Sequence, residues 1–150
     1  GSTTIIATSN NGISVTARVT IYYALDSYVV NELEPNGSTS WADPILVNGT
    51  TFKGYNSSKS DADYFALIMT SNQYYQINFY PPYSIDTDYF LVGLLDSSGT
   101  VLAAALKLNS TTRYLSFWTT YSGTYYVVVL YSSSSPYSSG MGYRGYSRWY

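Results

Sequence analysis

The 150-residue sequence contains no cysteine and no histidine, and only 11% of its residues are charged. The missing cysteine excludes disulfide bonds. The absence of both residue types excludes Cys or His nucleophiles, Ser-His-Asp triads and zinc sites built from Cys and His. Seven Lys and Arg residues against nine Asp and Glu residues give a net charge of −2, so we expect no nucleic-acid partner. No apolar run reaches the roughly eighteen residues of a membrane span, so we expect no membrane-spanning segment.

The residues that are plentiful favour strands. Hydrophobic residues make up 45% of the chain, enough for a compact core, and 19 Tyr stand beside 5 Phe and 3 Trp. Tyrosine, threonine and other β-favouring residues prefer strands to helices. A chain rich in Tyr, Ser, Thr and Asn with few lysines is typical of secreted and surface modules, so we expect a secreted or cell-surface location.

Turn signals divide the chain into short strands. The turn at Asn10-Asn11-Gly12 lies between alternating apolar runs and predicts a β-hairpin over Thr3–Tyr23. Leu25–Asp43 is rich in acid, proline and glycine and is interpreted as a linker or ordered loop. The further predicted strands are Ile45–Val47, Thr51–Tyr55, Tyr64–Met69, Tyr74–Tyr80, Tyr89–Leu95, Val101–Leu106, Tyr114–Trp118 and Tyr125–Tyr131. This spacing predicts an all-β fold, an antiparallel β-sandwich or jelly roll.

Alternation along these strands assigns their faces. Tyr75, Ile77 and Phe79 are expected in the core, because the residues between them are more polar. The segment 132–150 has a serine run and spaced glycines, followed by tyrosines and arginines. It is compatible with two structures, a loop leading into a final strand or a disordered adhesive tail.

Four motifs occur in a fixed order from about Tyr28 onward. They are Asn31-Glu32-Leu33-Glu34-Pro35-Asn36, Asp61-Ala62-Asp63-Tyr64-Phe65, Leu94-Leu95-Asp96-Ser97-Ser98-Gly99-Thr100-Val101-Leu102 and Ser122-Gly123-Thr124-Tyr125-Tyr126-Val127-Val128-Val129. In this order they resemble the bacterial pre-peptidase C-terminal domain family, β-sandwich modules that follow catalytic domains in secreted proteases and collagenases. The first hairpin resembles the last hairpin of a bacterial immunoglobulin-like domain. We therefore expect a hairpin and linker over residues 1–27 and a sandwich domain over residues 28–150.

Acidic residues concentrate where the loop meets the Tyr64 strand. Glu32 and Glu34 are two residues apart, as are Asp61 and Asp63, so each pair projects to one side of an extended segment. If the pairs meet, their repulsion calls for a hard cation such as Ca²⁺, which takes oxygen ligands. The alternative is that the glutamates are solvated and the aspartates cap a turn. The family resemblance implies calcium, with the ligands Glu32, Glu34, Asn36, Asp61 and Asp63.

Aromatic side chains expected on the surface provide the second functional hypothesis. Flat rings stack on sugar faces or on proline-rich chains, and the candidate ligand-binding residues are Tyr80, Trp118, Tyr126 and Tyr131. Nothing favours catalysis, so we expect no catalytic residues and no enzyme. We expect a noncatalytic accessory domain of a secreted protein such as a hydrolase, which binds an extracellular polymer or acts as a spacer. The resemblance implies a collagen-like polymer. Stacking implies a polysaccharide and a carbohydrate-binding module, and the remaining alternative is a structural stalk that contacts only neighbouring domains.

Overall fold

A computed structural model of the chain describes residues 2–8, 14–20, 28–47, 49–82, 85–136 and 141–149. The described structure is built from strands and one short 3-10 helix, and it contains no helix long and apolar enough to cross a membrane. The elements are β1 (Ser2–Thr8), β2 (Ser14–Thr20), β3 (Tyr28–Asn31), β4 (Asp43–Pro44), β5 (Thr50–Asn56), β6 (Ala62–Met69), β7 (Tyr74–Tyr80), η1 (Thr87–Tyr89), β8 (Phe90–Leu95), β9 (Val101–Ala104), β10 (Leu106–Asn109), β11 (Thr112–Trp118), β12 (Gly123–Tyr131) and β13 (Met141–Trp149).

The first two strands pair as the alternating pattern predicts. β1 and β2 are antiparallel, with Ser2 opposite Thr20 and Thr8 opposite Ser14. The turn expected at Asn10-Asn11-Gly12 and the expected junction between the two domains at residue 27 lie outside the described residues.

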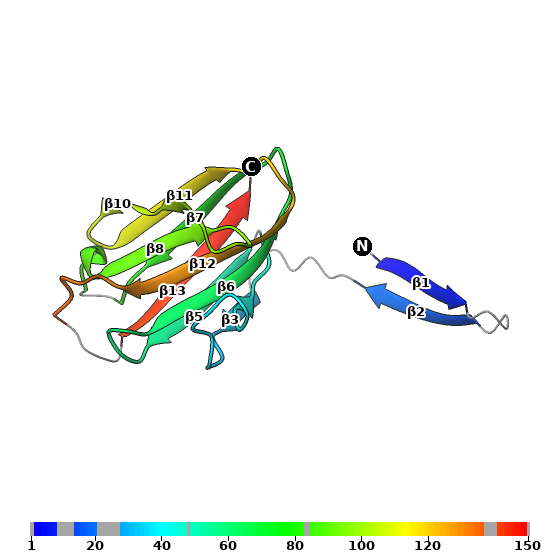
Figure 1. Ribbon diagram of the computed structural model, residues 1–150, viewed down its shortest axis with the longest axis horizontal. Helices are drawn as coiled ribbons and strands as arrows, with labels where there is room; N and C mark the ends of the chain where they lie inside the picture. The colour runs from blue at the N-terminus through cyan, green and yellow to red at the C-terminus, as the bar shows by residue number, and fades with distance from the viewer. Residues whose placement is uncertain are drawn as a thin grey trace.

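The remaining strands form the two sheets of a β-sandwich (Figure 1). One sheet has six strands in the order β10-β11-β7-β13-β5-β3, and the other has five in the order β4-β6-β12-β8-β9. This arrangement confirms the predicted all-β sandwich. Most pairs are antiparallel, but the edge strands β3 and β4 pair in parallel with β5 and β6. The sheets are therefore mixed. Between β3 and β4 the chain passes from the edge of the six-stranded sheet to the edge of the five-stranded sheet.

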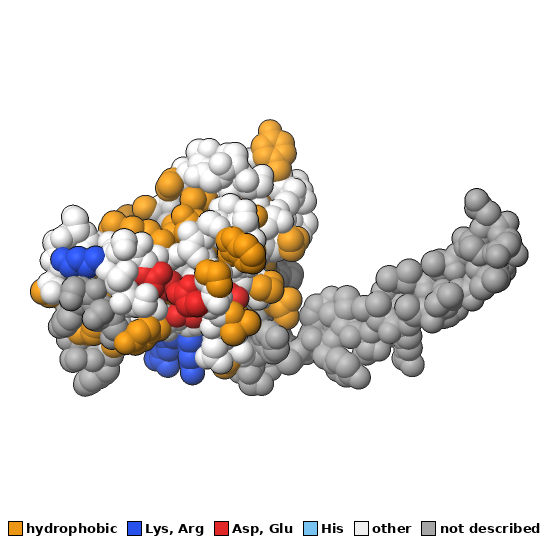
Figure 2. Space-filling view, turned by 60° about the horizontal axis from the view of Figure 1, so that its bottom comes forward, with side chains coloured by type: hydrophobic (Ala, Val, Ile, Leu, Met, Phe, Trp, Pro, Cys, Tyr) orange, Lys and Arg blue, Asp and Glu red, His pale blue; other side chains and the backbone are white. Residues whose placement is uncertain are grey.

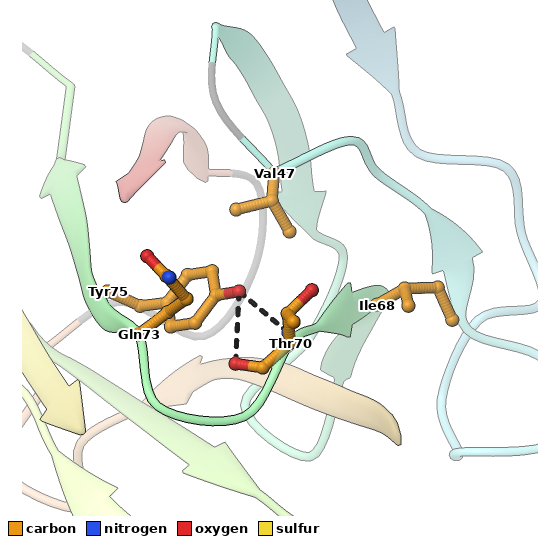
Figure 3. A pocket seen from close by; sticks show the side chains of 5 residues that line it. All are labelled: Val47, Ile68, Thr70, Gln73 and Tyr75. Carbon is orange, nitrogen blue, oxygen red and sulfur yellow. Dashed lines mark hydrogen bonds between the residues drawn. The ribbon is translucent and has the colours of Figure 1, made fainter. Parts of the chain in front are cut away.

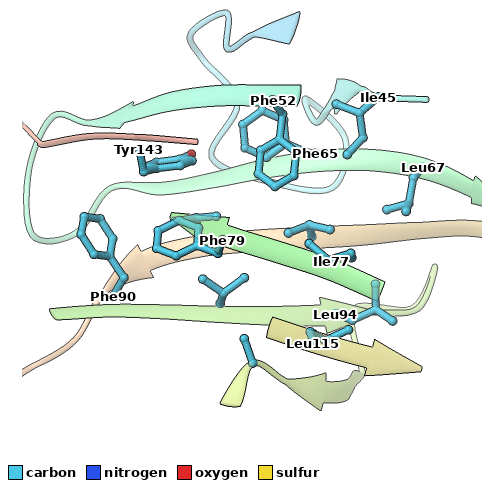
Figure 4. Close-up of a cluster of buried hydrophobic side chains, with 14 of the residues drawn as sticks. Ile45, Phe52, Phe65, Leu67, Ile77, Phe79, Phe90, Leu94, Leu115 and Tyr143 are labelled. Atoms are coloured by element: carbon cyan, nitrogen blue, oxygen red, sulfur yellow. The ribbon is translucent and has the colours of Figure 1, made fainter. Parts of the chain in front are cut away.

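The core lies between the sheets and is rich in rings (Figure 4). Tyr75, Ile77 and Phe79 are buried, as their alternation predicts. Phe52 and Phe65, from opposite sheets, have ring centroids 4.6 Å apart, and Phe79 and Phe90 have centroids 5.2 Å apart. Such tilted aromatic pairs stabilise a core beyond the area that they bury. With no disulfide, the fold relies on burial of these rings and of the aliphatic side chains packed with them.

The last strand occupies the middle of the six-stranded sheet. β13 pairs with β5 on one side and with β7 on the other. The alternative of a disordered tail is therefore wrong for residues 141–149, and the final strand of the other alternative is confirmed, whereas residues 137–140 lie outside the described residues. The inward-facing Gly145 leaves room for the ring of Phe52, since a Cβ atom there would lie 2.0 Å from Phe52 Cζ.

Two predicted strands differ in the structure. Residues 45–47 are not a strand, although Ile45 is buried and its N–H donates to Ala66 O at 2.8 Å. The predicted strand 101–106 is split at Ala105, where the chain crosses from the five-stranded sheet (β9) to the six-stranded sheet (β10). Ala105 is buried at this crossing, and its N–H donates to Val92 O at 2.8 Å. An apolar run shows burial but does not reveal a change of sheet.

We predict that Gly145→Ala lowers the free energy of unfolding by about 3 kcal/mol, because the new methyl group overlaps the buried ring of Phe52. Gly142→Ala is the matched control on the same strand. Its Cβ atom would lie 3.7 Å from Gly54 O, an ordinary contact, and we expect a change below about 1 kcal/mol. Urea unfolding of both variants measures the difference. Equal losses in the two variants would contradict the packing described for β13.

Candidate metal centre

The loop after β3 begins by continuing the parallel pairing with β5. Glu32 N donates to Lys53 O at 2.9 Å, which fixes the backbone of Glu32 beside β5. Glu32 Oε1 in turn accepts a hydrogen bond from Tyr55 N at 2.6 Å. The glutamate is therefore held at the edge of the six-stranded sheet by both its backbone and its side chain.

The rest of the loop is anchored to the other sheet. Asp43 Oδ2 accepts hydrogen bonds from Leu33 N at 2.9 Å and from Asn36 Nδ2 at 3.3 Å. Asn36 is fully buried, and its backbone O accepts from Tyr64 N on β6 at 3.2 Å. The loop thus folds against the start of β6, which brings the loop acids close to Asp63 of β6.

Three carboxylates meet between the two sheets, where the loop after β3 packs against the start of β6, and we call this place the seam. Glu32, Glu34 and Asp63 each offer an oxygen, and these oxygens all lie within 4.8 Å of one another. Figure 2 shows acidic side chains gathered together on one face of the sandwich. Asp63 is fully buried, whereas Glu32 is half-buried and Glu34 is exposed. Like charges this close repel each other strongly unless a proton or a cation lies between them.

Several buried oxygens at the seam have no hydrogen-bond partner among the described residues. They are Glu32 Oε2, Asn36 Oδ1, Asn56 Oδ1 and Asp63 Oδ1. Buried polar atoms are nearly always partnered in folded proteins, so these acceptors require a proton shared between Glu32 and Asp63, a water molecule or a bound cation. Carboxylate and amide oxygens are the donors that Ca²⁺ prefers, and it takes about six to eight of them. The donor set at the seam therefore fits a hard cation.

Burial changes the acidity of these groups. Removal from water raises the pKa of Asp63 from 3.8 to about 8, against the opposing effect of a hydrogen bond from Tyr143, and the nearby charge of Glu32 raises it further. Burial also raises the pKa of Glu32. Without a cation, the folded protein therefore holds a proton at this seam up to about pH 8.

Tyr143 is the residue at this site that the sequence interpretation missed. Its Oη donates to Asp63 Oδ2 at 2.5 Å, which joins β13 of one sheet to β6 of the other. Burial raises the pKa of Tyr143 well above 10, so the hydroxyl remains a donor. Gly54 makes the space for it, because a Cβ atom there would lie 2.1 Å from Tyr143 Oη.

The predicted calcium ligands have different places. Glu32, Glu34 and Asp63 come together, and Asn36 lies on the same loop with a buried unpartnered oxygen. Asp61 lies outside the three-carboxylate group. Its Oδ2 accepts hydrogen bonds from Ser57 N at 2.6 Å and from Ser57 Oγ at 2.7 Å, so it caps the turn between β5 and β6. For Asp61 the structure thus matches the alternative of a turn cap.

The predicted binding aromatics do not form one surface. The expectation that Tyr131 is exposed is wrong, because it lies inward on β12 and packs against Phe90 with ring centroids 5.3 Å apart. Trp118 is 54% exposed, and Tyr80 is half-buried on the same outer face of the six-stranded sheet. Tyr126 lies on the outer face of the five-stranded sheet, since its neighbours Tyr125 and Val127 point inward. The cluster expected around Trp118 and Tyr126 is therefore split between opposite faces.

The other acids have structural partners. Asp86 and Asp88 pair with Lys107 at 2.9 and 2.5 Å, and Asp88 also pairs with Arg113 at 2.8 Å. Asp96 Oδ1 accepts from Ser98 N at 2.8 Å and closes the predicted hairpin turn, in which Gly99 has a φ of 84°. These contacts account for both acidic segments as turn and ion-pair structure.

A pocket of about 260 Å³ is present beside the loop after β6. Its lining residues are Val47, Ile68, Thr70, Gln73 and Tyr75 (Figure 3). The Tyr75 hydroxyl accepts from Thr70 N at 2.7 Å and donates to Thr70 O at 3.5 Å. Its polar group therefore supports the loop after β6. No charged side chain lines this pocket among the described residues, and we assign it no function.

Comparison with known proteins identifies solved structures with a similar fold. No protein-family model and no curated protein matches the sequence. Among solved structures, the chain is similar to the pre-peptidase C-terminal domain of a Bacillus anthracis collagenase, with a TM-score of 0.56 and 20% identity over 71% of this chain and 93% of that chain. It is also similar to Aeromonas hydrophila PliG, a periplasmic lysozyme inhibitor of g-type lysozyme, with a TM-score of 0.56 and 8% identity over 82% and 98% of the two chains. The first likeness confirms the predicted resemblance at the level of the fold.

We predict that the metal-free protein loses stability as the pH rises. The folded state holds the Asp63 proton up to a pKa of about 8, whereas the unfolded chain releases it near 3.8. Stability from this proton is therefore present below about pH 4 and is lost as the pH rises toward 8. Urea unfolding in chelator across this range measures the effect. Asp63→Asn should flatten the profile. Asp96→Asn should leave the profile unchanged above about pH 5, because the lowered pKa of Asp96 affects stability only at more acidic pH. A flat profile for the unsubstituted protein would contradict the buried-proton account.

Proposed function

We propose that this chain is a noncatalytic accessory module of a secreted or cell-surface protein, that Ca²⁺ stabilises it, and that it binds an extracellular polymer. The observation that carries the calcium assignment is the convergence of Glu32, Glu34 and Asp63, with buried oxygens that have no partner among the described residues. Asn36 would add a neutral oxygen from the same loop. The shared fold with a collagenase accessory domain supports the role of an attached module.

The proposed ion would act as a clamp between the two sheets. Glu32 follows β3 and is tied to β5 of the six-stranded sheet, whereas Asp63 lies on β6 of the five-stranded sheet. A cation between them would replace repulsion with attraction and hold the loop after β3 against the sandwich. It would also stiffen the point at which the preceding part of the chain joins the domain.

We predict that calcium raises the melting temperature relative to a chelator baseline. A ligand that binds only the folded state stabilises it by about 2.7 kcal/mol at a hundred times its Kd. Asp63→Asn should remove most of the shift, because it removes a buried charged ligand. Asp96→Asn is the control, since that carboxylate closes a surface turn away from the seam. Magnesium should give a smaller shift, because it prefers a small octahedral site that retains water.

An unchanged melting curve in calcium would contradict the calcium proposal. An equal loss of the calcium shift in the Asp63→Asn and Asp96→Asn variants would place the ion elsewhere. Either result is separate from polymer binding, which a different surface would carry.

The polymer-binding surface proposed here is the outer face of the six-stranded sheet, where Trp118 is opposite Tyr74 in the register and both rings are exposed. We predict that Trp118→Ala weakens retention on an insoluble polymer by about tenfold without unfolding the domain, because a stacked ring contributes about 1–3 kcal/mol. Tyr126→Ala is the control on the opposite face and should leave retention unchanged. Pull-down on insoluble collagen, chitin and cellulose measures the retention of each variant. Failure on every polymer would favour the alternative of a structural spacer.

A further inference from the structure

The charged residues of the sandwich strands are divided between the two sheets. Five cations lie in strands of the six-stranded sheet, and no Asp or Glu occurs in any of its strands. The cations are Lys53, Lys107, Arg113, Arg144 and Arg148. The strands of the five-stranded sheet contain Asp43 and Asp63 and no Lys or Arg. The division gives the six-stranded sheet a positive character that the net charge of −2 hides.

Three of these cations are on the outer face of the six-stranded sheet. Lys107 and Arg113 are paired with Asp86 and Asp88, and their charges are compensated. Lys53, Arg144 and Arg148 are exposed and alternate with inward-facing residues of β5 and β13. Among the residues that the structure describes, no carboxylate lies within ion-pair distance of Lys53 or Arg144. Positive charge on this face is thus directed at solvent.

The register joins these cations to aromatic rings in rows across the sheet. Lys53 is opposite Arg144, and Arg144 is opposite Tyr80 on β7. The guanidinium carbon of Arg144 lies 5.3 Å from the centre of the Tyr80 ring, and that of Arg148 lies 5.6 Å from the centre of the Tyr146 ring. Cation–π contacts of this kind attract a guanidinium to the face of a ring and so restrict the conformations of the arginine side chain. The two arginines are therefore partly ordered before any ligand arrives, which reduces the entropy lost on binding.

A groove of about 710 Å³ crosses the strands at the end of the face where Lys53, Arg144 and Tyr80 lie. Its lining includes Lys53, Tyr80, Pro82, Thr112 and Arg144. Gly142, which also lines it, adds no side chain and leaves the sheet surface open there. The groove thus offers two cations, a ring and a hydroxyl to a ligand that lies across the strands.

The exposed Trp118 and Tyr74 lie at the opposite end of the same face. Tyr74 and Tyr80 are the first and last residues of β7, so about 20 Å of strand separates this ring pair from the groove. A small molecule cannot contact both ends at once. An extended polymer that carries anionic groups and flat apolar ring faces matches both.

We propose that the outer face of the six-stranded sheet binds an acidic polysaccharide. Its carboxylate or sulfate groups contact Lys53 and Arg144 in the groove, and its sugar rings stack on Trp118 and Tyr74. Guanidinium groups form paired hydrogen bonds with planar anions, and indole and phenol rings pack against sugar faces. This inference rests on the polymer-binding part of the proposed function and names the class of polymer.

The test compares polymers that differ only in charge. Binding of the whole chain to dextran, carboxymethyl dextran and dextran sulfate is measured at a fixed calcium concentration. We expect at least about tenfold tighter binding to one or both charged forms than to dextran, and weaker binding as salt rises. Preference between the two charged forms separates carboxylate from sulfate recognition. Equal binding to all three would overturn the inference.

Matched variants locate the surface. The double variant Lys53→Gln/Arg144→Gln should lose about tenfold in affinity for the charged polymer. Lys59→Gln removes the same kind of charge from the turn between β5 and β6 and should leave affinity unchanged. Trp118→Ala should weaken binding and leave its salt dependence in place. An equal effect of Lys59→Gln and the double variant would overturn the assignment, because it would show nonspecific charge attraction.

Two other probes distinguish the competing classes of ligand. Binding to a DNA duplex as tight as to dextran sulfate would overturn the polysaccharide assignment in favour of a general polyanion surface. Binding to gelatin or neutral dextran alone would overturn this inference and leave the polymer-binding proposal intact. Binding to no probe would overturn both, whereas the calcium-dependent shift in melting temperature would remain a separate result.

Discussion

The candidate metal centre depends on the burial of the Asp63 carboxyl group at the seam between the two sheets. Asp63 is on β6 and accepts a hydrogen bond from Tyr143 on β13, so this bond joins the five-stranded sheet to the six-stranded sheet. A buried charge is costly unless it is partnered. The neighbouring backbone is adapted to this requirement, because Gly54 leaves space for the Tyr143 hydroxyl and the loop from Glu32 to Asn36 brings further oxygens.

This seam also relates the fold to its two proposed roles. β13 lies between β5 and β7, so the strand that delivers Tyr143 inward also presents Arg144, Tyr146 and Arg148 outward. Acid is concentrated at the seam and in the five-stranded sheet, whereas the strands of the six-stranded sheet carry cations and no acid. One sandwich therefore offers sites of opposite charge, one suited to a cation and the other to an anionic polymer.

Much of the fold could be predicted from the sequence, since alternation identified the inward set Tyr75, Ile77 and Phe79 and the spacing of acids brought Glu32, Glu34 and Asp63 together. Tyr143 could not be predicted, because the inward positions of its strand include the small residues Gly145 and Ser147, which weaken the apolar alternation. The small size of Gly145 reflects the space taken by Phe52. Tyr131 was predictable, since it shares the inward parity of Val127 and Val129. The separation of Trp118 from Tyr126 depends on which sheet each strand joins, and strand pairing over long sequence distances leaves no local signal.

The most direct test of the central claim is a crystal structure of the protein grown with calcium, with anomalous scattering used to locate the ion. The account predicts an ion between Glu32, Glu34 and Asp63, with oxygen ligands at about 2.3–2.6 Å and with Tyr143 still donating to Asp63. A seam without an ion at saturating calcium, in which a shared proton joins the Glu32 and Asp63 carboxyl groups, would contradict it.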